Sequence, residues 1–253
     1  MAEPVSLLIT GSSGFIGSHL LRMAREQHPD WEVVRLDIED ADDVRNCDAP
    51  LLQAFDYVVH LAAISDTRTS GKELFDVNVM GAVALCEALA DSPKLKRLVY
   101  VSSIQRAEDS LYGASKQCAE IVLQGYAARG LEASTVQLCN VYGPGQTGRL
   151  IPNCIEAILA GYDAPIDGHK NDQRTFLYVD DACRIILEVL TGDAYSPVET
   201  TSKTVGEVAT DIYRLIHHPS TDEHGSSTPW EAGLHATIQW HRERRAENTV
   251  LSA

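Results

Sequence analysis

Short apolar runs of strand length alternate with longer segments of helical period along the first 140 residues, and this alternation restricts the possible folds most. Five runs are predicted strands, at residues 5–10, 32–37, 57–61, 97–102 and 133–138. The segments between them repeat apolar residues at helical spacing, at about 15–28, 74–90 and 112–129. Strands that alternate with helices form βαβ units, in which helices cover both faces of a parallel sheet. The sequence therefore predicts an α/β fold with a doubly wound parallel sheet.

The rhythm of the sequence changes after residue 140. A helix is predicted near 152–160 and a strand near 175–179, and further helices follow near 180–191, 204–216 and 229–245. We expect residues 1–140 to form the sheet domain, whose core also receives later segments. Residues 141–253 are expected to form mainly a small C-terminal α/β cap. The chain of 253 residues is long enough for two such unequal domains.

The charge of the chain excludes several classes of partner. With 21 basic and 36 acidic residues the formal net charge is −15, which would repel a nucleic-acid backbone or an anionic membrane surface. No apolar run approaches the roughly 20 residues that span a bilayer, and a signal peptide is not evident. We expect a cytoplasmic protein without nucleic-acid or membrane partners, in which a local site holds any anionic ligand.

Neither the cysteines nor the histidines form a pattern that indicates a metal. The six cysteines are widely spaced without a C-x-x-C pair and lie mostly in apolar segments, as reduced core thiols do. The polar stretch 217–228 holds three histidines without a ligand spacing, and its Pro, Gly and Ser content is typical of a loop. We therefore predict no metal site.

A glycine-rich turn follows the first predicted strand directly and opens the first predicted helix. Its glycines, Gly11, Gly14 and Gly17, have the spacing G-x-x-G-x-x-G. The first glycine permits a tight turn, the second lets the backbone approach a pyrophosphate, and the third lets helix and strand pack closely. Free N–H groups and the helix dipole attract an anion to this end of a helix. The turn is therefore a candidate dinucleotide site.

An acidic residue at the end of the second predicted strand supports this interpretation. Asp37 lies 20 residues after Gly17, where a carboxylate can accept hydrogen bonds from the hydroxyls of an adenosine ribose. The same carboxylate would repel the 2′-phosphate of NADP. We therefore predict NAD as the cofactor.

A tyrosine and a lysine near residue 112 indicate acid–base chemistry. Tyr112 and Lys116 are four residues apart and therefore lie on one face of the helix that begins there. The ammonium favours the phenolate and lowers the pKa of the phenol towards the working pH, which makes Tyr112 a candidate general base. The fourth predicted strand leads into Ser102 and Ser103, one of which can hydrogen-bond the substrate oxygen that loses or gains a proton.

Seven sequence blocks, spread over nearly the whole chain, occur in a characteristic order. They are TGSSGFIG at 10–17, HLAA at 60–63, NVMG at 78–81, YVSS at 100–103, YGASK at 112–116, NVYGPGQ at 140–146 and RTFLYVDDA at 174–182. In this order the blocks resemble the extended short-chain dehydrogenase/reductase family, specifically its NAD-dependent epimerase/dehydratase branch, which acts on nucleotide sugars. The resemblance implies a Rossmann-type fold.

The resemblance also implies roles for particular residues. It implies a catalytic triad of Ser103, Tyr112 and Lys116. The residues that it implies for NAD binding are, besides Tyr112 and Lys116, Gly11, Ser13, Gly14, Phe15, Ile16, Gly17, Asp37, Leu61, Ala62, Ala63, Asn78 and Val101. Those implied for substrate binding are Ser65, Ser103, Asn140 and Arg174. Arg174 would be a phosphate clamp, because a guanidinium can bind two phosphate oxygens at once.

The chain departs from the family pattern in several places. Tyr112 follows Ser103 by only nine positions, so the segment that helps roof the active site in the family is short here. Dehydratases of the branch carry Thr-Asp-Glu where this chain has Ser103-Ile104-Gln105, which disfavours elimination because no acidic pair can protonate a leaving hydroxyl. Gln137 replaces an arginine, which would remove one cation, and the late R-x-G-D segment with a second arginine for the pyrophosphate is absent.

Three functions are compatible with these features. We expect an NAD-dependent nucleotide-sugar epimerase, acting at C4 through transient hydride transfer to NAD and a keto-sugar intermediate. The first alternative is an NAD-dependent dehydrogenase or reductase of a sugar or small carbonyl compound, because a trimmed cap would release cofactor and product readily. The second is a catalytically weak NAD-binding regulatory module.

The helices near 74–90 and 112–129 carry more apolar side chains than one sheet-facing stripe needs. Val79, Val83, Ile121 and Val122 are the extra residues. In the family that the chain resembles, the corresponding helices form a dimer seam. We therefore expect a homodimer with an isologous interface.

Overall fold

The computed structural model describes residues 3–37, 43–104, 110–193, 198–218 and 229–251. The chain divides into two compact units. The first consists of Met1–Cys139 and Ala182–Ser196, and the second of Asn140–Asp181 and Pro197–Ala253. The chain therefore leaves the first unit after Cys139 and returns to it at Ala182.

The first unit is built on a parallel sheet. Its strands are β1 (Ser6–Thr10), β2 (Glu32–Leu36), β3 (Tyr57–His60), β4 (Arg97–Ser103) and β5 (Ala133–Leu138). They follow the spatial order β2-β1-β3-β4-β5, and every neighbouring pair is parallel. The strand order reverses between β1 and β3. Ligands of open α/β sheets bind at such a reversal, outside the carboxyl ends of the strands.

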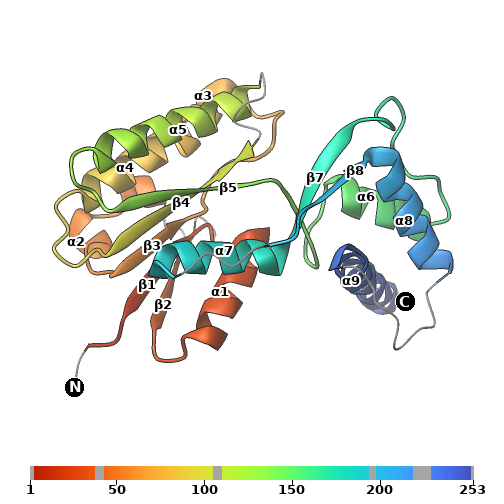
Figure 1. The fold of residues 1–253 in the computed structure, drawn as a ribbon, viewed down its shortest axis with the longest axis horizontal. Helices are drawn as coiled ribbons and strands as arrows, with labels where there is room; N and C mark the ends of the chain where they lie inside the picture. Colours follow the sequence, from red (N-terminus) through yellow and green to blue (C-terminus); the bar gives the residue numbers. More distant parts are fainter. Residues whose placement is uncertain (1–2, 38–42, 105–109, 194–197, 219–228, 252–253) are drawn as a thin grey trace. The chain divides into compact units, whose positions relative to one another are not determined.

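Helices cover both faces of this sheet. They are α1 (Phe15–Gln27), the 3-10 turn η2 (Val44–Asn46), α2 (Ala49–Leu52), α3 (Gly71–Asn78), α4 (Met80–Leu89), α5 (Leu111–Ala127) and α7 (Val179–Thr191), the last of which begins in the second unit. Figure 1 shows α3, α4 and α5 on one face of the sheet, and α1 and α7 on the other. The predicted doubly wound, Rossmann-type α/β fold is confirmed.

A buried apolar cluster fixes α4 and α5 against the sheet. Leu8, Leu98 and Tyr100 point from the sheet into this cluster, where they pack with Leu85 of α4 and Leu123 of α5. Burying a large apolar side chain stabilises a fold by about 1.5–3 kcal/mol. Because α5 is anchored in this way, its first two turns are held beside the carboxyl end of β4.

The helix predicted at 74–90 is in fact two helices. α3 begins at Gly71, because the Ser70 side chain accepts a hydrogen bond of 3.3 Å from the Glu73 N–H and caps the helix. It ends at Asn78, and α4 starts after Val79. The apolar pattern missed the true start because its first residue, Leu74, lies a full turn after the capping residue.

The second unit combines a small mixed sheet with helices. The strands are β6 (Asn140–Tyr142), β7 (Gln173–Tyr178) and β8 (Thr201–Thr204), and β7 pairs with β6 in parallel and with β8 antiparallel. The helices are α6 (Leu150–Leu159), α8 (Val205–His217) and α9 (Pro229–Leu251). Sequence periodicity missed β6, which has only three residues, and β8, which contains no apolar residue.

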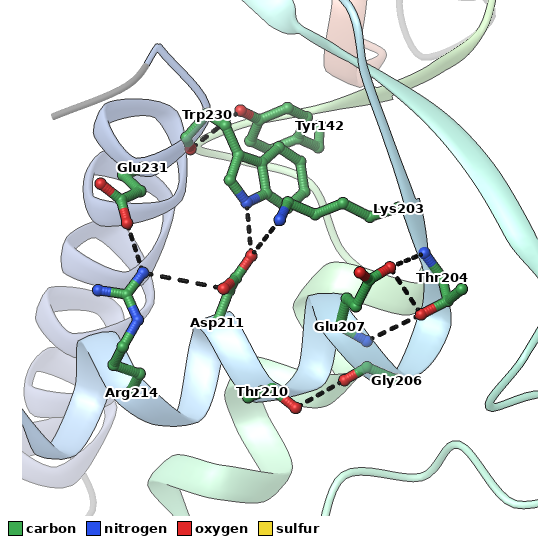
Figure 2. Close-up of polar contacts among 10 residues, drawn as sticks. All are labelled: Tyr142, Lys203, Thr204, Gly206, Glu207, Thr210, Asp211, Arg214, Trp230 and Glu231. Atoms are coloured by element: carbon green, nitrogen blue, oxygen red, sulfur yellow. Dashed lines mark hydrogen bonds and ion pairs between the residues drawn. The ribbon is translucent and has the colours of Figure 1, made fainter.

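Aromatic and charged side chains join the sheet of the second unit to its helices. Tyr142, Phe176 and Trp230 lie with their ring centroids 5.0–6.4 Å apart. Asp211 of α8 accepts a hydrogen bond of 2.9 Å from Trp230 Nε1 and lies 3.0 Å from Lys203 Nζ of β8 (Figure 2). Asp211 therefore ties the start of α9 to both α8 and β8.

Two features singled out in the sequence fall outside the described residues. Gln105 belongs to 105–109, and most of the polar stretch 217–228, including its third histidine, belongs to 219–228. Within the described ranges, no three potential metal ligands of the His, Cys, Asp and Glu types gather in one place. The described helices also lack the combination of length and apolar content that would let them cross a membrane.

Candidate active site

The glycine turn between β1 and α1 lies against the segment that follows β3. Gly11 has φ +69°, a left-handed conformation that glycine adopts without strain. A Cβ at this position would come within 2.6 Å of the Ala62 backbone nitrogen, so a side chain cannot fit. The first glycine is therefore required both by its own conformation and by the approach of the β3 segment. The two segments meet where the strand order reverses.

The other two glycines let α1 begin at the turn. A Cβ on Gly17 would lie 2.1 Å from the Gly11 carbonyl oxygen, so only glycine allows this close packing. Gly14 is the N-cap of α1, and it offers no side-chain hydrogen bond to the helix. The N–H groups of the first turn, which include those of Phe15 and Ile16, therefore face outward for an anion.

Asp37 lies beside the same turn. Its Oδ2 accepts a hydrogen bond of 2.9 Å from the Ser13 backbone N–H. The Gly11 N–H also donates to the Leu36 carbonyl of β2, at 3.1 Å. The carboxylate predicted to bind a ribose is therefore adjacent to the turn predicted to bind a pyrophosphate. The residues present therefore fit a dinucleotide, in which the adenosine ribose and the pyrophosphate are adjacent.

Asn78 holds the segment after β3 in place. Its Oδ1 accepts a hydrogen bond of 2.7 Å from the Ile64 N–H, and its Nδ2 donates to the Ile64 carbonyl at 3.0 Å and to Ser115 Oγ at 2.9 Å. The buried amide thus fixes the stretch that begins with Leu61, Ala62 and Ala63 to α5. A direct contact of Asn78 with a cofactor stays a prediction. Ser65, which follows this stretch, is exposed.

Tyr112 and Lys116 lie in the first two turns of α5. Ser110 caps the helix by accepting a hydrogen bond of 2.9 Å from the Gly113 N–H. The side chains of Tyr112 and Lys116 are buried. Lys116 Nζ donates a hydrogen bond of 2.8 Å to the Val101 carbonyl of β4. The structure therefore brings the predicted acid–base pair to the carboxyl end of the sheet.

The ammonium of Lys116 lies in a largely apolar environment. Its Nζ is 4.5 Å from the centre of the Tyr100 ring. Burial lowers the pKa of Lys116 to about 8, and the Glu120 carboxylate opposes this shift. Burial, together with Tyr112 and Glu120, raises the pKa of Tyr100 far above its ordinary value. Tyr100 therefore stays a neutral phenol whose ring face the ammonium contacts.

The two serines at the end of β4 differ in their accessibility. Ser102 is buried, and its hydroxyl finds no hydrogen-bond partner among the described residues. Ser103 is partly exposed. Neighbouring residues of a strand point to opposite faces, so the two hydroxyls cannot serve the same ligand atom equally well. Ser103 is the more accessible of the two, and its catalytic role stays a prediction.

The second unit contains the other residues predicted to face a substrate. Asn140 Nδ2 donates a hydrogen bond of 2.9 Å to the Thr175 carbonyl and so joins β6 to β7. Arg174 of β7 lies opposite Lys203 of β8. Within the part of the chain that the structure describes, the Arg174 guanidinium has no hydrogen-bond or ion-pair partner. The nearby Asp172 carboxylate lies 2.8 Å from His169 Nδ1.

The Gln137 side chain of β5 contacts α5. Its Nε2 donates to both carboxylate oxygens of Glu120, at 3.1 and 3.3 Å. The structure thus places the Gln137 side chain beside α5, and the loss of a cation from the substrate site stays a prediction.

Sequence reasoning missed a buried polar pair beside Lys116. His60 Nδ1 lies 2.7 Å from Thr10 Oγ1, and burial lowers the pKa of His60 to about 3, so the ring is neutral. His60 Nε2 and the Tyr100 hydroxyl have no partner among the described residues, and the two rings lie 5.8 Å apart. His60 and Tyr100 both lie in apolar strands, where they resemble ordinary core residues. The HLAA and YVSS blocks that contain them were the available signal.

Three known proteins resemble this chain over most of its length. It is 27% identical to a UDP-N-acetyl-alpha-D-glucosaminuronate decarboxylase of Bacillus cytotoxicus, over 93% of this chain and 97% of the relative. It is 26% identical, over 95% of its length, to a trifunctional UDP-glucose 4,6-dehydratase/UDP-4-keto-6-deoxy-D-glucose 3,5-epimerase/UDP-4-keto-L-rhamnose-reductase of Arabidopsis thaliana, but spans only 47% of that protein. The crystal structure of UDP-glucuronic acid 4-epimerase from Bacillus cereus, in complex with UDP-glucuronic acid and NAD, superimposes with a TM-score of 0.81 and 22% identity, covering 94% of this chain and 99% of that one.

The matches also show that this chain is shorter than a relative and which family it belongs to. The alignment with the decarboxylase runs over 318 positions although this chain has only 253 residues, so that relative carries internal segments without a counterpart here. A sequence model of the NAD dependent epimerase/dehydratase family matches residues 7–199, which is well over half of the chain. The match confirms both the resemblance carried by the sequence blocks and the predicted NAD dependence. The chain belongs to the NAD-dependent epimerase/dehydratase family of enzymes.

Proposed function

We propose that the protein is an NAD-dependent nucleotide-sugar epimerase that acts at C4 of the sugar. The three relatives are named for a decarboxylation, a dehydration coupled to further steps, and a 4-epimerisation, and all of these names specify UDP-sugars. The relatives thus support a nucleotide sugar as the substrate class but leave the reaction open. The choice among reactions depends on the residues of the site.

Residues of the first unit would hold NAD. The N–H groups at the start of α1 would bind the pyrophosphate, Asp37 would accept hydrogen bonds from the adenosine ribose, and Lys116 would bind the nicotinamide ribose. The backbone at Leu61–Ala63 would line the site beside the glycine turn. Bound NAD would accept a hydride from the sugar carbon and return it.

Tyr112 would move the proton of the reaction. Its phenolic oxygen would take the proton of the sugar hydroxyl, and the Lys116 ammonium, one helical turn away, would favour the phenolate. Ser103 would hydrogen-bond the same sugar oxygen. Because the buried core anchors α5, Tyr112 and Lys116 need little rearrangement before they act.

The residues that follow β4 favour epimerisation over dehydration, and this observation carries the proposal. Elimination of water needs a group that protonates the leaving hydroxyl in addition to the base that oxidises the sugar. This chain has Ser103-Ile104-Gln105 at the position of the acidic pair, and Ile104 is exposed and apolar. Epimerisation needs only one acid–base group, since Tyr112 can take the proton in the first half of the reaction and return it in the second.

A panel of UDP-sugars and dTDP-sugars, incubated with the protein and NAD, tests the proposal. We expect two C4 epimers to interconvert, with no change of mass and no lasting absorbance of reduced nicotinamide. A lasting absorbance would instead identify a dehydrogenase, loss of water a dehydratase, and loss of carbon dioxide a decarboxylase. If the protein converted none of the sugars and retained no NAD, it would be none of these enzymes, and the proposal would be contradicted.

Two tyrosine variants separate the chemistry from the fold. Tyr112→Phe should lower turnover by about a hundredfold or more while leaving the melting temperature and NAD affinity nearly unchanged, because it removes only the acid–base hydroxyl. Tyr100→Phe is the matched control. It removes a buried hydroxyl that has no partner among the described residues and keeps the ring that Lys116 contacts. Full activity of Tyr112→Phe would refute the role assigned to this residue.

A further inference from the structure

Glu120 lies one helical turn after Lys116 on the buried face of α5. Each of the two residues is only 4% exposed. Side chains four residues apart on a helix are neighbours, with their Cβ atoms about 5–6 Å apart. The two side chains are therefore neighbours on a buried face of the helix, where water screens little, and the Glu120 carboxylate raises the pKa of Lys116 against the effect of burial.

Gln137 of β5 fixes the orientation of the Glu120 carboxylate. Its Nε2 donates to Oε2 at 3.1 Å and to Oε1 at 3.3 Å. An amide is neutral, so this contact orients the carboxylate without adding a positive charge to it. The negative charge of Glu120 can therefore act on Lys116.

The other titratable groups that face Lys116 do not supply a negative charge at rest. His60 of β3 is neutral because burial lowers its pKa to about 3, and Tyr100 of β4 is a neutral phenol because burial raises its pKa. Tyr112 lies one turn before Lys116 on the same helix and is the group that Lys116 is proposed to assist. Among the described groups around Lys116, the Glu120 carboxylate is the one that favours the ammonium.

We propose that Glu120 is a positioning residue that keeps Lys116 charged, so that the ammonium can stabilise the Tyr112 phenolate. The inference rests on the proposed function, because it gives Lys116 that role. Removing the carboxylate leaves the desolvation of Lys116 unopposed. Loss of an opposite charge near an ionisable group shifts its pKa by about one unit or more, so the pKa of Lys116 should fall by about that amount.

A titration of Lys116 tests the coupling without any substrate. The Nζ resonance of the full-length protein, labelled with 15N-lysine and assigned from its loss in Lys116→Arg, is followed against pH by NMR. Glu120→Gln should lower the pKa of Lys116 by about one unit. The matched control, Glu132→Gln, removes an exposed carboxylate just before β5 and should leave the pKa unchanged. An unchanged Lys116 titration in folded Glu120→Gln would overturn the proposal, whether or not the protein proves to be an epimerase.

The pH profile of turnover then separates positioning from mere stability. With the substrate found in the sugar panel, kcat of Glu120→Gln should be about fivefold below wild type at pH 8 and nearly equal to it at pH 6, since an ammonium is fully charged at the lower pH. A loss of the same size at every pH would contradict the positioning role. Gln137→Arg, which adds a cation beside Glu120, should act in the same direction and provides a second variant if Glu120→Gln does not fold.

Discussion

The Asp37 carboxylate accepts a hydrogen bond of 2.9 Å from the Ser13 N–H, which joins the end of β2 to the glycine turn. A 2′-phosphate on a ribose held there would meet this negative charge. We therefore expect NAD(H) to bind at least tenfold more tightly than NADP(H), a difference of about 1.4 kcal/mol.

Calorimetric titration of both cofactors measures this preference. Asp37→Asn is the informative variant, because its side-chain oxygen can still accept the hydrogen bond from Ser13 while the charge is gone. It should lose most of the preference and keep the turn intact. Equal affinities of the wild-type protein for NAD and NADP would show that Asp37 does not face the ribose.

Arg174 is proposed to bind the diphosphate of a nucleotide sugar. Its guanidinium has no ion-pair partner among the described residues, so its removal should cost little stability. Arg174→Ala should raise the KM for a nucleotide sugar by roughly 10–100-fold with a smaller change in kcat, because a charge-assisted hydrogen bond contributes about 1.5–3 kcal/mol.

The matched control for Arg174 is its neighbour across the strand pair. Lys203 is bound to Asp211 at 3.0 Å, so Lys203→Ala should lower the melting temperature with little effect on KM. Binding of UDP and dTDP by calorimetry gives the same comparison without turnover. If Arg174→Ala melted earlier and bound nucleotide normally, its role would be structural.

Local patterns predicted the parts of the site that one strand end or one helix turn determines. The glycine spacing predicted the tight turn that Gly11 makes between β1 and α1, and the four-residue spacing placed Tyr112 and Lys116 on one face of α5. The contact between Gln137 and Glu120 could not be predicted in this way. It joins residues 17 positions apart on a strand and a helix, and only tertiary packing decides which of their faces meet. Strand β8 (TSKT) was missed for a similar reason, since pairing with β7 rather than its own apolar content stabilises it.

The exposed apolar residues of α4 and α5 mark the proposed dimer interface. Ile121 and Leu111 of α5 are 60% and 56% exposed and Met80 of α4 is 52% exposed, whereas Val122 packs against the core of its own unit. Val122, which was predicted to add to the dimer interface, therefore contributes to the core of its own unit. We expect wild type to have the mass of a dimer by light scattering at micromolar concentration, and Ile121→Glu to have that of a monomer. Tyr213→Glu changes an exposed aromatic residue of the second unit and should leave the dimer intact, while a monomeric wild type would contradict the interface.

Asp56 makes the stability of the first unit depend on pH. Burial raises the pKa of its carboxyl, but hydrogen bonds from Ser6 and Lys96 outweigh this effect and lower the pKa to about 2. A carboxyl with a depressed pKa in the folded protein stabilises it above about pH 4, and this contribution of about 2 kcal/mol is lost as the pH falls towards 2. In chemical denaturation, Asp56→Asn should be less stable than wild type by about that amount at pH 7, and the difference should shrink at pH 3. The exposed Asp30→Asn should show no such difference at either pH, and a gap for Asp56→Asn that stayed constant with pH would refute the assignment.

The fate of the hydrogen at C4 of the sugar tests the central claim most directly. A UDP-sugar deuterated at C4 is incubated with the protein and NAD in ordinary water, and the product is examined by NMR and mass spectrometry. If Tyr112 takes the hydroxyl proton while the hydrogen on carbon passes to the cofactor and back, the C4 epimer should form with its deuterium retained at C4, and Tyr112→Phe should form it about a hundredfold more slowly. An epimer that has lost the deuterium to water, or a product that has lost water or carbon dioxide in place of an epimer, would contradict the account.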